Sequence, residues 1–378
     1  MLRSYRLRDY DFRLIIYLAA ITVIGILVIG SAEEGVQTRQ IAGFLVGLFF
    51  MVVLSLFDYT VFLRFYWCFY VLTIVLLLLV HFFGRTVNNA KRWVEIAGIQ
   101  FQPSEAAKIL LILFYAQYMM KRKEKISSFK TIIIMLGLLA PPLYLIYKQP
   151  DLSTTILILL IFCQLLYSGG LSMKVIIGFL VIAIPAGIIF LTLVLQPDQK
   201  IIKDYQQTRI LAWLSPEEYS TAEGYQQDNS KMAIGSGKLT GKGLDNDDIS
   251  SVKNGNFISE PQTDFIFAIV GEELGFIGGI TVIVLLLLIT LECLLIARKA
   301  KDQAGMLIAS GMAALVGFQS FMNISVATGL MPNTGIPLPF VSYGLTSLMS
   351  LYIGMGIVLN VRLQAERRTV SYQGLDIM

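Results

Sequence analysis

The sequence predicts an all-α polytopic membrane protein of about ten transmembrane helices, with one large extracytoplasmic loop. Of its 378 residues, 56% are hydrophobic and 15% are charged. The mean hydropathy of +0.69 lies outside the usual range of soluble domains. Apolar runs long enough to cross a hydrocarbon core about 30 Å thick occur ten times. They lie at 13–31, 42–57, 61–83, 105–120, 131–147, 152–168, 173–195, 265–297, 305–328 and 340–361.

One of these apolar segments, 265–297, is long for a single span. It contains Gly271, Gly275, Gly278 and Gly279, and glycines permit sharp bends in a long helix. We therefore expect one span that is tilted, bent or divided.

The basic residues predict the orientation in the membrane. If the N-terminus is cytoplasmic, the short inner segments hold most of the lysines and arginines, including the run 121–125. Such an excess marks the cytoplasmic side of a membrane protein. Both termini are therefore predicted to be cytoplasmic. The net charge of +4 follows from this topology, and no feature predicts binding to nucleic acid.

Counts of histidine and cysteine exclude several enzyme classes. His81 is the only histidine, so a histidine-based triad and a multi-histidine metal site are impossible. Cys68, Cys163 and Cys293 all lie in apolar runs. We expect them to be small buried side chains and predict no disulfide or metal framework.

The loop 196–263 is too long to be a simple connector, because structureless loops beyond about 15 residues are uncommon unless they are functional or disordered. Residues 203–214 have the spacing of an amphipathic helix ahead of Pro216. Glycines punctuate the stretch 235–243, which also carries Lys238 and Lys242. Two readings of this stretch stay open: an anion-binding turn and an ordinary flexible loop.

Three acidic residues stand where predicted outer loops enter apolar runs: Glu105, Asp151 and Asp264. Helix capping explains each of them singly, because an acid near a helix N-terminus complements the free backbone donors and the helix dipole.

A second interpretation treats these acids together with the basic residues on the same predicted face. A carboxylate can take a proton from a sugar hydroxyl, while Arg and Lys hold a departing diphosphate. Glu272 and Glu273 follow in the same segment and would be costly inside a bilayer unless they are partnered. The basic residues of this face are Lys91, Arg92, Lys108 and Arg209.

A series of motifs extends along nearly the whole chain. They are Asn89-Ala90-Lys91-Arg92-Trp93, the stretch 101–108, Gln149-Pro150-Asp151-Leu152, the stretches 233–237 and 260–268, Gly271-Glu272-Glu273-Leu274-Gly275, and the proline-rich stretch 332–344. With these motifs the chain resembles the SEDS family (shape, elongation, division and sporulation), which includes RodA-like and FtsW-like proteins. The Gly241-Lys242-Gly243 stretch and Gln262 favour the RodA branch.

The resemblance implies a single transmembrane domain over 1–378, with the 196–263 loop between helices 7 and 8. It implies a peptidoglycan glycosyltransferase of the bacterial cytoplasmic membrane that polymerises lipid II on the outer face, for cell elongation (rod shape) or division. A class B penicillin-binding protein is the implied transpeptidase partner.

The resemblance also places several of the site residues, among them Arg92, Glu105, Lys108 and Asp151, and the residues singled out above complete the set. The essential acid of the family falls on Asp264, the predicted catalytic residue. The substrate-binding candidates are Lys91, Arg92, Glu105, Lys108, Asp151, Lys238, Lys242, Glu273 and Ser342, and the structural candidates are Pro103, Pro332, Pro337 and Pro339.

The sequence departs from the family pattern at two positions. Ser153 and Leu345 stand where glycine is usual. Leucine does not readily adopt a positive φ, so we expect local changes of the backbone and little effect on the reaction.

The predicted mechanism makes Asp264 the general base on the 4-hydroxyl of an acceptor GlcNAc. This hydroxyl attacks the anomeric carbon of MurNAc with inversion, and undecaprenyl pyrophosphate leaves. Lys91, Arg92 and Lys108 are the candidates for holding the diphosphate. No cofactor is predicted with certainty, and a divalent cation (Mg²⁺ or Mn²⁺) at the diphosphate stays open.

Two other functions stay open at this stage. A lipid II flippase or other transporter would place its polar site near the middle of the membrane, whereas most of the acids and bases here fall at the outer boundary. A non-catalytic scaffold that activates a transpeptidase would tolerate charge-neutral changes at Asp264.

Overall fold

The computed structural model describes residues 10–87, 90–96, 99–196, 199, 201–202, 204–215, 223–244, 258 and 261–365. The first helices are α1 (Phe12–Ala32), α2 (Glu34–Leu56), α3 (Tyr59–Leu63), α4 (Tyr66–Phe83), α5 (Pro103–Met120), α6 (Phe129–Lys148), α7 (Leu152–Ser168) and α8 (Met173–Val194). They are followed by α9 (Asp204–Leu214), α10 (Glu223–Ser236), α11 (Ile266–Lys299), α12 (Gln303–Ala327) and α13 (Leu345–Leu363), and the strands are β1 (Arg85–Val87), β2 (Ala90–Ile96) and β3 (Ile99–Phe101).

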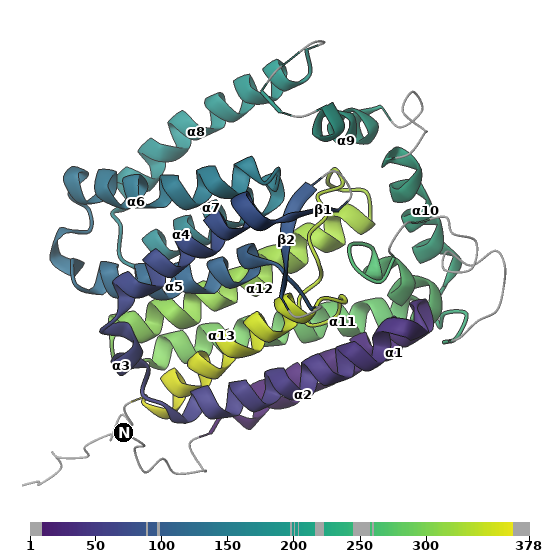
Figure 1. Cartoon of the computed structure of the whole chain (residues 1–378), viewed down its shortest axis with the longest axis horizontal. Helices are drawn as coiled ribbons and strands as arrows, with labels where there is room; N and C mark the ends of the chain where they lie inside the picture. The colour runs from purple at the N-terminus through teal and green to yellow at the C-terminus, as the bar shows by residue number, and fades with distance from the viewer. Residues whose placement is uncertain are drawn as a thin grey trace, which may run out of the picture.

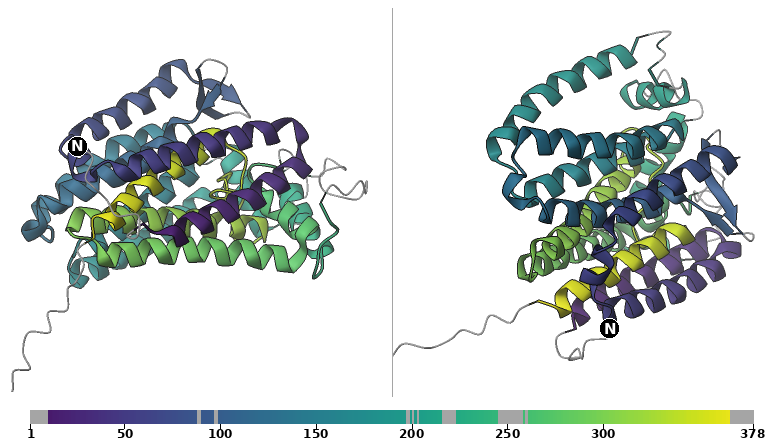
Figure 2. Two further views of the ribbon diagram at one scale, coloured as in Figure 1. Left: turned by 90° about the horizontal axis from the view of Figure 1, so that it is seen from below. Right: turned by 60° about the vertical axis from the view of Figure 1, so that its left-hand side comes forward.

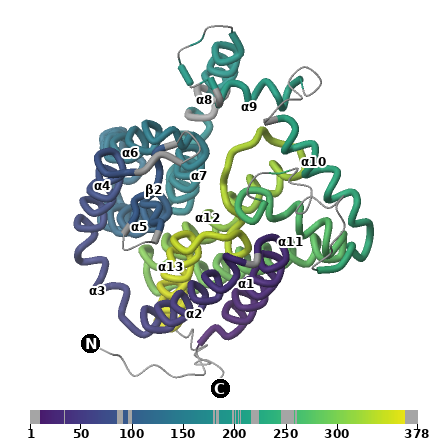
Figure 3. The backbone as a smooth tube through the Cα atoms, turned by 45° about the vertical axis from the view of Figure 1, so that its right-hand side comes forward, coloured from purple at the N-terminus to yellow at the C-terminus, as the bar shows by residue number. Residues whose placement is uncertain are grey.

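The helix α12 forms the centre of the bundle. It packs against α5, α7, α11 and α13, and the view in Figure 3 places it among them. Of its most apolar stretch, 78% is buried, compared with 22% for α4. Small side chains such as Ala309, Gly311 and Ala313 lie on its buried faces, and small residues let neighbouring helices approach closely in a membrane.

The remaining long helices surround this centre. In Figure 1, α1, α2, α11 and α13 run alongside one another, with α4, α5, α6 and α7 on the other side of α12. Figure 2 shows α8 extending away from the rest of the bundle, whereas α9 returns to it, with Trp213 donating to the carbonyl of Gly329.

Each of the ten predicted apolar runs coincides with helical structure. Within the described residues, seven helices are long and apolar enough to cross a membrane by length and composition, namely α1, α2, α4, α6, α11, α12 and α13. The helical membrane fold is therefore confirmed, while the count of ten spans, which also needs α5, α7 and α8, stays a prediction. The division into one domain with the loop 196–263 between helices 7 and 8 is likewise a prediction.

Two local predictions are confirmed. The long segment is one element, α11, broken at Gly275, where φ is 65° and ψ is −163°. The amphipathic stretch 203–214 contains α9 (Asp204–Leu214). The sequence analysis missed a small antiparallel sheet of order β1-β2-β3 between α4 and α5. The strands β1 and β3 have only three residues each, and the seven residues of β2 do not alternate regularly between apolar and polar side chains.

The expectation that all three cysteines are buried is wrong for two of them. Cys293 is buried, whereas Cys68 and Cys163 are exposed on α4 and α7. An apolar run selects small hydrophobic side chains on its lipid-facing side as well as on its protein-facing side, so the composition alone does not separate these positions.

Candidate active site at one end of the bundle

Asp264 lies in a turn that leads into α11, and its backbone is held from three directions. The carbonyl oxygens of residues 262–264 each accept one hydrogen bond. The donors are the backbone N–H of Tyr343 at 2.9 Å, the hydroxyl of Ser342 at 2.6 Å and the side-chain amide of Asn323 at 2.8 Å. The chain around the predicted catalytic acid is therefore fixed, and Ser342 contributes through this turn.

The proline-rich stretch forms a wall beside Asp264. It contains Pro332, Pro337 and Pro339, and Gly335 adopts a positive φ of 65°. A Cβ placed on Gly335 would lie 3.2 Å from Oδ2 of Asp264 and 3.8 Å from Nη1 of Arg209. The missing side chain of this glycine thus leaves room for the carboxylate and lets it approach the wall.

Arg209 comes from α9, which belongs to the long loop 196–263. Its guanidinium and the carboxylate of Asp264 both lie against Gly335. A base and a cation therefore lie close together at Gly335, and they come from segments far apart in the sequence. This pairing is suited to proton removal beside a developing negative charge.

Glu105 and Lys108 form a buried ion pair behind the wall. Lys108 Nζ lies 2.8 Å from Glu105 Oε1, and the two side chains are only 2% and 3% exposed. The same ammonium donates to Oε1 of Gln319 at 2.8 Å, and Nε2 of Gln319 donates to the carbonyl of Pro337 at 2.9 Å. The pair is thus linked to the wall through one amide of α12.

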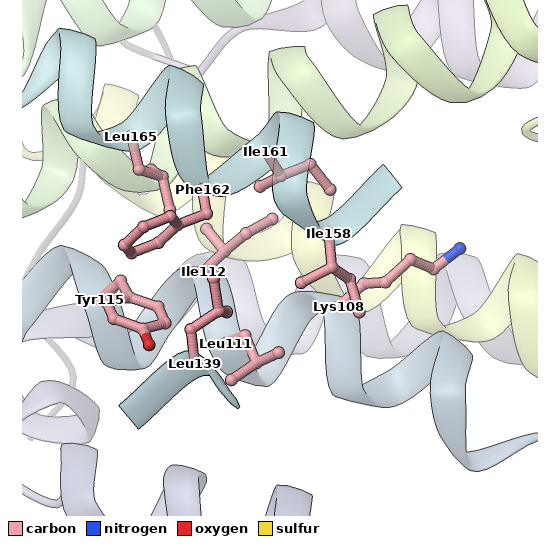
Figure 4. A pocket seen from close by; sticks show the side chains of 9 residues that line it. All are labelled: Lys108, Leu111, Ile112, Tyr115, Leu139, Ile158, Ile161, Phe162 and Leu165. Carbon is pink, nitrogen blue, oxygen red and sulfur yellow. The ribbon is translucent and has the colours of Figure 1, made fainter. Parts of the chain in front are cut away.

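The stem of Lys108 also lines an apolar pocket between α5, α6 and α7. The other lining residues include Leu139, Ile158 and Phe162. Figure 4 shows the ammonium pointing away from these apolar side chains, so Lys108 contributes only its methylene groups to the lining of the pocket.

Arg92 and Asp151 lie together at the start of α7. Arg92 Nη1 is 3.9 Å from Asp151 Oδ1, and the guanidinium also donates to the carbonyls of Gln149 and Pro150. Asp151 accepts from the backbone N–H of Thr154 at 3.1 Å. Capping therefore describes Asp151 correctly.

Neither of the other two acids is an N-cap residue, although Glu105, in the first turn of α5, still complements the helix dipole. The N-cap residues of α5 and α11 are Gln102 and Phe265, and neither makes a side-chain cap hydrogen bond. Glu105 lies in the first turn of α5, where Pro103 occupies the N-terminal position. Glu105 and Asp264 are thus engaged by tertiary contacts.

The remaining basic candidates have their own contacts. Lys91 donates to the carbonyl of His81 at the end of α4, at 2.8 Å. Lys242 pairs with Glu272 at 2.7 Å, and the hydroxyl of Ser31 donates to Glu273. The last contact joins the C-terminal end of α1 to the N-terminal part of α11. Lys238 is exposed.

The glycine-rich stretch 235–243 packs tightly on α11 where α11 breaks. A Cβ on Gly237 would lie 1.9 Å from the carbonyl oxygen of Gly271, and one on Gly241 would lie 2.1 Å from that of Glu273. The backbone N–H of Phe276 donates to the carbonyl of Lys238 at 2.9 Å. Its glycines serve close backbone packing, which argues against the flexible loop, and the anion-binding turn stays a prediction.

Both departures from the family pattern are accommodated. The hydroxyl of Ser153 donates to the carbonyl of Thr334, so it ties α7 to the wall. Leu345 is the first residue of α13, and its side chain packs over Gly43 of α2. Leu345 thus has a helical backbone and needs no positive φ.

Sequence reasoning missed Gln319 and Asn323. Both are buried in α12 and donate to backbone carbonyls of the wall. Their signal was available: two amides four residues apart lie on one face of a helix, and polar side chains inside a span are costly unless they are bonded.

The fold and this site define a multi-pass helical membrane protein with a polar centre at one end of the bundle. Residues 11–367 match the model of the cell cycle protein family of FtsW, RodA and SpoVE, and the chain belongs to this family. It is therefore a multi-pass protein of the bacterial inner membrane.

Relatives and solved structures agree with this assignment. The chain is 36% identical over 354 residues to the peptidoglycan glycosyltransferase MrdB of Escherichia coli K12, covering 93% of each chain. It is 34% identical over 367 residues to a probable peptidoglycan glycosyltransferase FtsW of Geobacter metallireducens, covering 93% of this chain and 94% of the relative.

Among solved structures, a chain of a peptidoglycan synthase complex that coordinates polymerization and crosslinking matches with a TM-score of 0.77 at 27% identity, covering 93% of this chain and 97% of that one. The rod shape determining protein RodA of Thermus thermophilus matches with a TM-score of 0.69 at 26% identity, covering 95% and 98%.

Proposed function

We propose that this chain, a peptidoglycan glycosyltransferase by its family, polymerises lipid II with Asp264 as the general base. The observation that carries the proposal is the meeting of Asp264 and Arg209 at Gly335, with the backbone of Asp264 held by Asn323. A glycan polymerase needs a fixed base beside a cation, and this end of the bundle supplies both.

The proposed step is a single displacement. The carboxylate of Asp264 takes the proton of the acceptor's 4-hydroxyl, and the hydroxyl oxygen forms a bond to the anomeric carbon of the donor MurNAc. The bond from that carbon to the diphosphate breaks, and its electron pair leaves with undecaprenyl pyrophosphate. Because the donor link is α and the product link is β-1,4, the configuration inverts and no covalent enzyme intermediate is needed.

The developing charge of the leaving group requires cations. Arg209 lies beside the base, and Arg92 is held at the start of α7 by Asp151 and two backbone carbonyls. A guanidinium held in this way binds phosphate oxygens bidentately. We assign these two arginines to the diphosphate. Lys91 stays a candidate for the same role, as does a divalent cation bound by the diphosphate itself.

We propose that the reaction takes place at the outer face of the membrane, with both termini in the cytoplasm. The site end of the bundle carries the long loop, while the basic run at 121–125 follows the opposite end of α5, as expected of a cytoplasmic side. A class B penicillin-binding protein is the proposed partner, and the resemblance to the RodA branch favours a role of the pair in cell elongation over one in division.

The test is polymerisation by the purified chain with its partner. Lipid II carrying a fluorescent stem peptide is supplied in detergent, and the products are separated by gel electrophoresis after blocking crosslinking with penicillin. We expect glycan strands that lysozyme-type muramidases digest. A folded complex that moves lipid II across vesicle membranes and forms no glycan would support a transporter instead.

A further inference from the structure

Two buried amides on α12 face the site one helical turn apart. Gln319 and Asn323 are 0% and 1% exposed. Residues four apart lie on the same face of a helix, and here that face meets both the wall and the turn of Asp264. Neither side chain is one of the acids or bases assigned to the reaction.

Asn323 joins the turn of Asp264 to the wall. Its Nδ2 donates to the carbonyl of Asp264 at 2.8 Å and to the carbonyl of Ile336 at 2.7 Å. Both hydrogens of the amide are thereby used, and two carbonyls fix which end of the amide faces them. One side chain thus sets the spacing between the predicted base and Gly335, the residue against which the carboxylate of Asp264 lies.

The other end of the Asn323 amide makes no comparable contact. Its Oδ1 is buried and has no hydrogen-bond partner among the described residues. Buried polar atoms are normally satisfied, and violations of such rules concentrate at functional sites. The side chain is held in place by its two donors alone, so what it contributes is the position of the two carbonyls.

Gln319 is oriented by charge. Its Oε1 accepts from the ammonium of Lys108 at 2.8 Å and its Nε2 donates to the carbonyl of Pro337 at 2.9 Å. An ammonium has donors only, so the oxygen of the amide must face Lys108 and the nitrogen must face the wall. Lys108 is itself fixed by Glu105.

We propose that Gln319 and Asn323 form an amide clamp that positions Asp264 against the wall, and that the Glu105–Lys108 pair orients this clamp. They are positioning residues, because they act through Asp264 and do not touch the reacting atoms. The inference rests on the proposed role of Asp264. A misplacement of a reacting group by about 1 Å can cost about 100-fold in rate, so losing the clamp lowers kcat and leaves the binding of lipid II nearly unchanged.

The experiment compares Asn323→Ala with a matched control, Asn360→Ala. Asn360 is a buried amide of α13 that also makes two hydrogen bonds to backbone groups. It donates to the carbonyl of Ser55 at 2.7 Å and accepts from the N–H of Tyr59 at 2.9 Å. Both variants are purified with the transpeptidase partner and compared by thermal unfolding, by the Kd for lipid II and by kcat and KM for polymerisation.

We expect both variants to lose stability and only Asn323→Ala to lose kcat, by about 10- to 100-fold, with KM and Kd within threefold. Gln319→Glu, which keeps an oxygen toward Lys108 and loses the donor toward Pro337, follows the same pattern. If Asn323→Ala is not recovered folded, Asn323→Ser, which keeps one donor, is measured in its place. Its kcat should then lie between that of the parent and the value expected for Asn323→Ala.

The outcomes separate the clamp from the base. An Asn323→Ala protein with kcat within twofold of the parent, alongside an inactive Asp264→Asn protein, overturns the clamp and leaves the base assignment standing. An active Asp264→Asn protein overturns the base assignment and the clamp with it. Equal losses of kcat in Asn323→Ala and Asn360→Ala mean that general stability explains the effect, which also overturns the clamp.

Discussion

Removing the cation of the buried ion pair should destabilise the protein more than removing both charges. In Lys108→Met the carboxylate of Glu105, 3% exposed, loses its partner at 2.8 Å and has no access to solvent. Breaking a buried pair in this way costs about 3–5 kcal/mol. In the double variant Glu105→Leu with Lys108→Met no charge remains, and the cost falls to that of the unpaired oxygen of Gln319, about 1–3 kcal/mol.

The assay is reversible unfolding in mixed detergent micelles, with the free energy of unfolding compared among the parent, the single variant and the double variant. We expect the single variant to be less stable than the double variant by about 2 kcal/mol. A single variant as stable as the double variant, or more stable, would refute the reasoning, because it would show that the carboxylate of Glu105 is solvated.

Three further variants probe other contacts. Gly335→Ala forces a residue with a side chain into a positive φ, which costs about 1–2 kcal/mol, and places its Cβ 3.2 Å from Asp264 Oδ2. The kcat for polymerisation should therefore fall at least tenfold, and an unchanged kcat would contradict the geometry of the wall. Gly237→Ala should make the long loop susceptible to limited proteolysis, because the added Cβ would lie 1.9 Å from a carbonyl oxygen of α11. The control Gly235→Ala, whose Cβ would have no atom within 4 Å, should not. Equal cleavage of both variants would contradict the packing of this turn on α11. Burial raises the pKa of the Asp58 carboxyl, but hydrogen bonds from Gln364 and Thr60 outweigh it and lower the pKa on balance. The ionised carboxylate of Asp58 therefore stabilises the fold above its unfolded pKa of about 3.9. This stabilisation is lost as the pH falls below that value. Asp58→Asn should thus be less stable than the parent at pH 5–8, with the gap closing below about pH 4, and a gap independent of pH would contradict this.

The helices could be predicted from the sequence because their signal is local. A run of apolar residues long enough to span a membrane identifies itself, and the amphipathic spacing of α9 and the glycines of α11 act over a few residues. Asp264 was predicted from its position before an apolar run and from the family motif. What it contacts could not be predicted in this way.

The contacts of the site depend on packing between segments far apart in the sequence. Asn323 reaches Asp264 across 59 positions, and Lys108 reaches Gln319 across 211. Which face of α12 turns toward the wall is decided by the small side chains that pack it against α5 and α7, and no short motif encodes that rotation. For the same reason the sequence could not predict the partner of a basic side chain such as Lys242, which pairs with Glu272.

The glycine-rich stretch illustrates a further limit. Alternating glycine and lysine suggested an anion-binding turn or a flexible loop, because both use glycine for conformational freedom. Gly237 serves through another property of glycine, its lack of a side chain, where two backbones touch, and Gly241, with a φ of 81°, combines both properties. Only the neighbouring backbone of α11 reveals this requirement.

The central claim is that the carboxylate of Asp264 removes the acceptor's proton, and the rate of a single turnover in Asp264→Asn tests it most directly. With lipid II bound at saturation and its Kd checked separately, the account predicts a fall of at least 1,000-fold in glycan formation while Kd stays within about threefold. Glycan formation within tenfold of the parent, by a variant that is folded and bound to its partner, would contradict it.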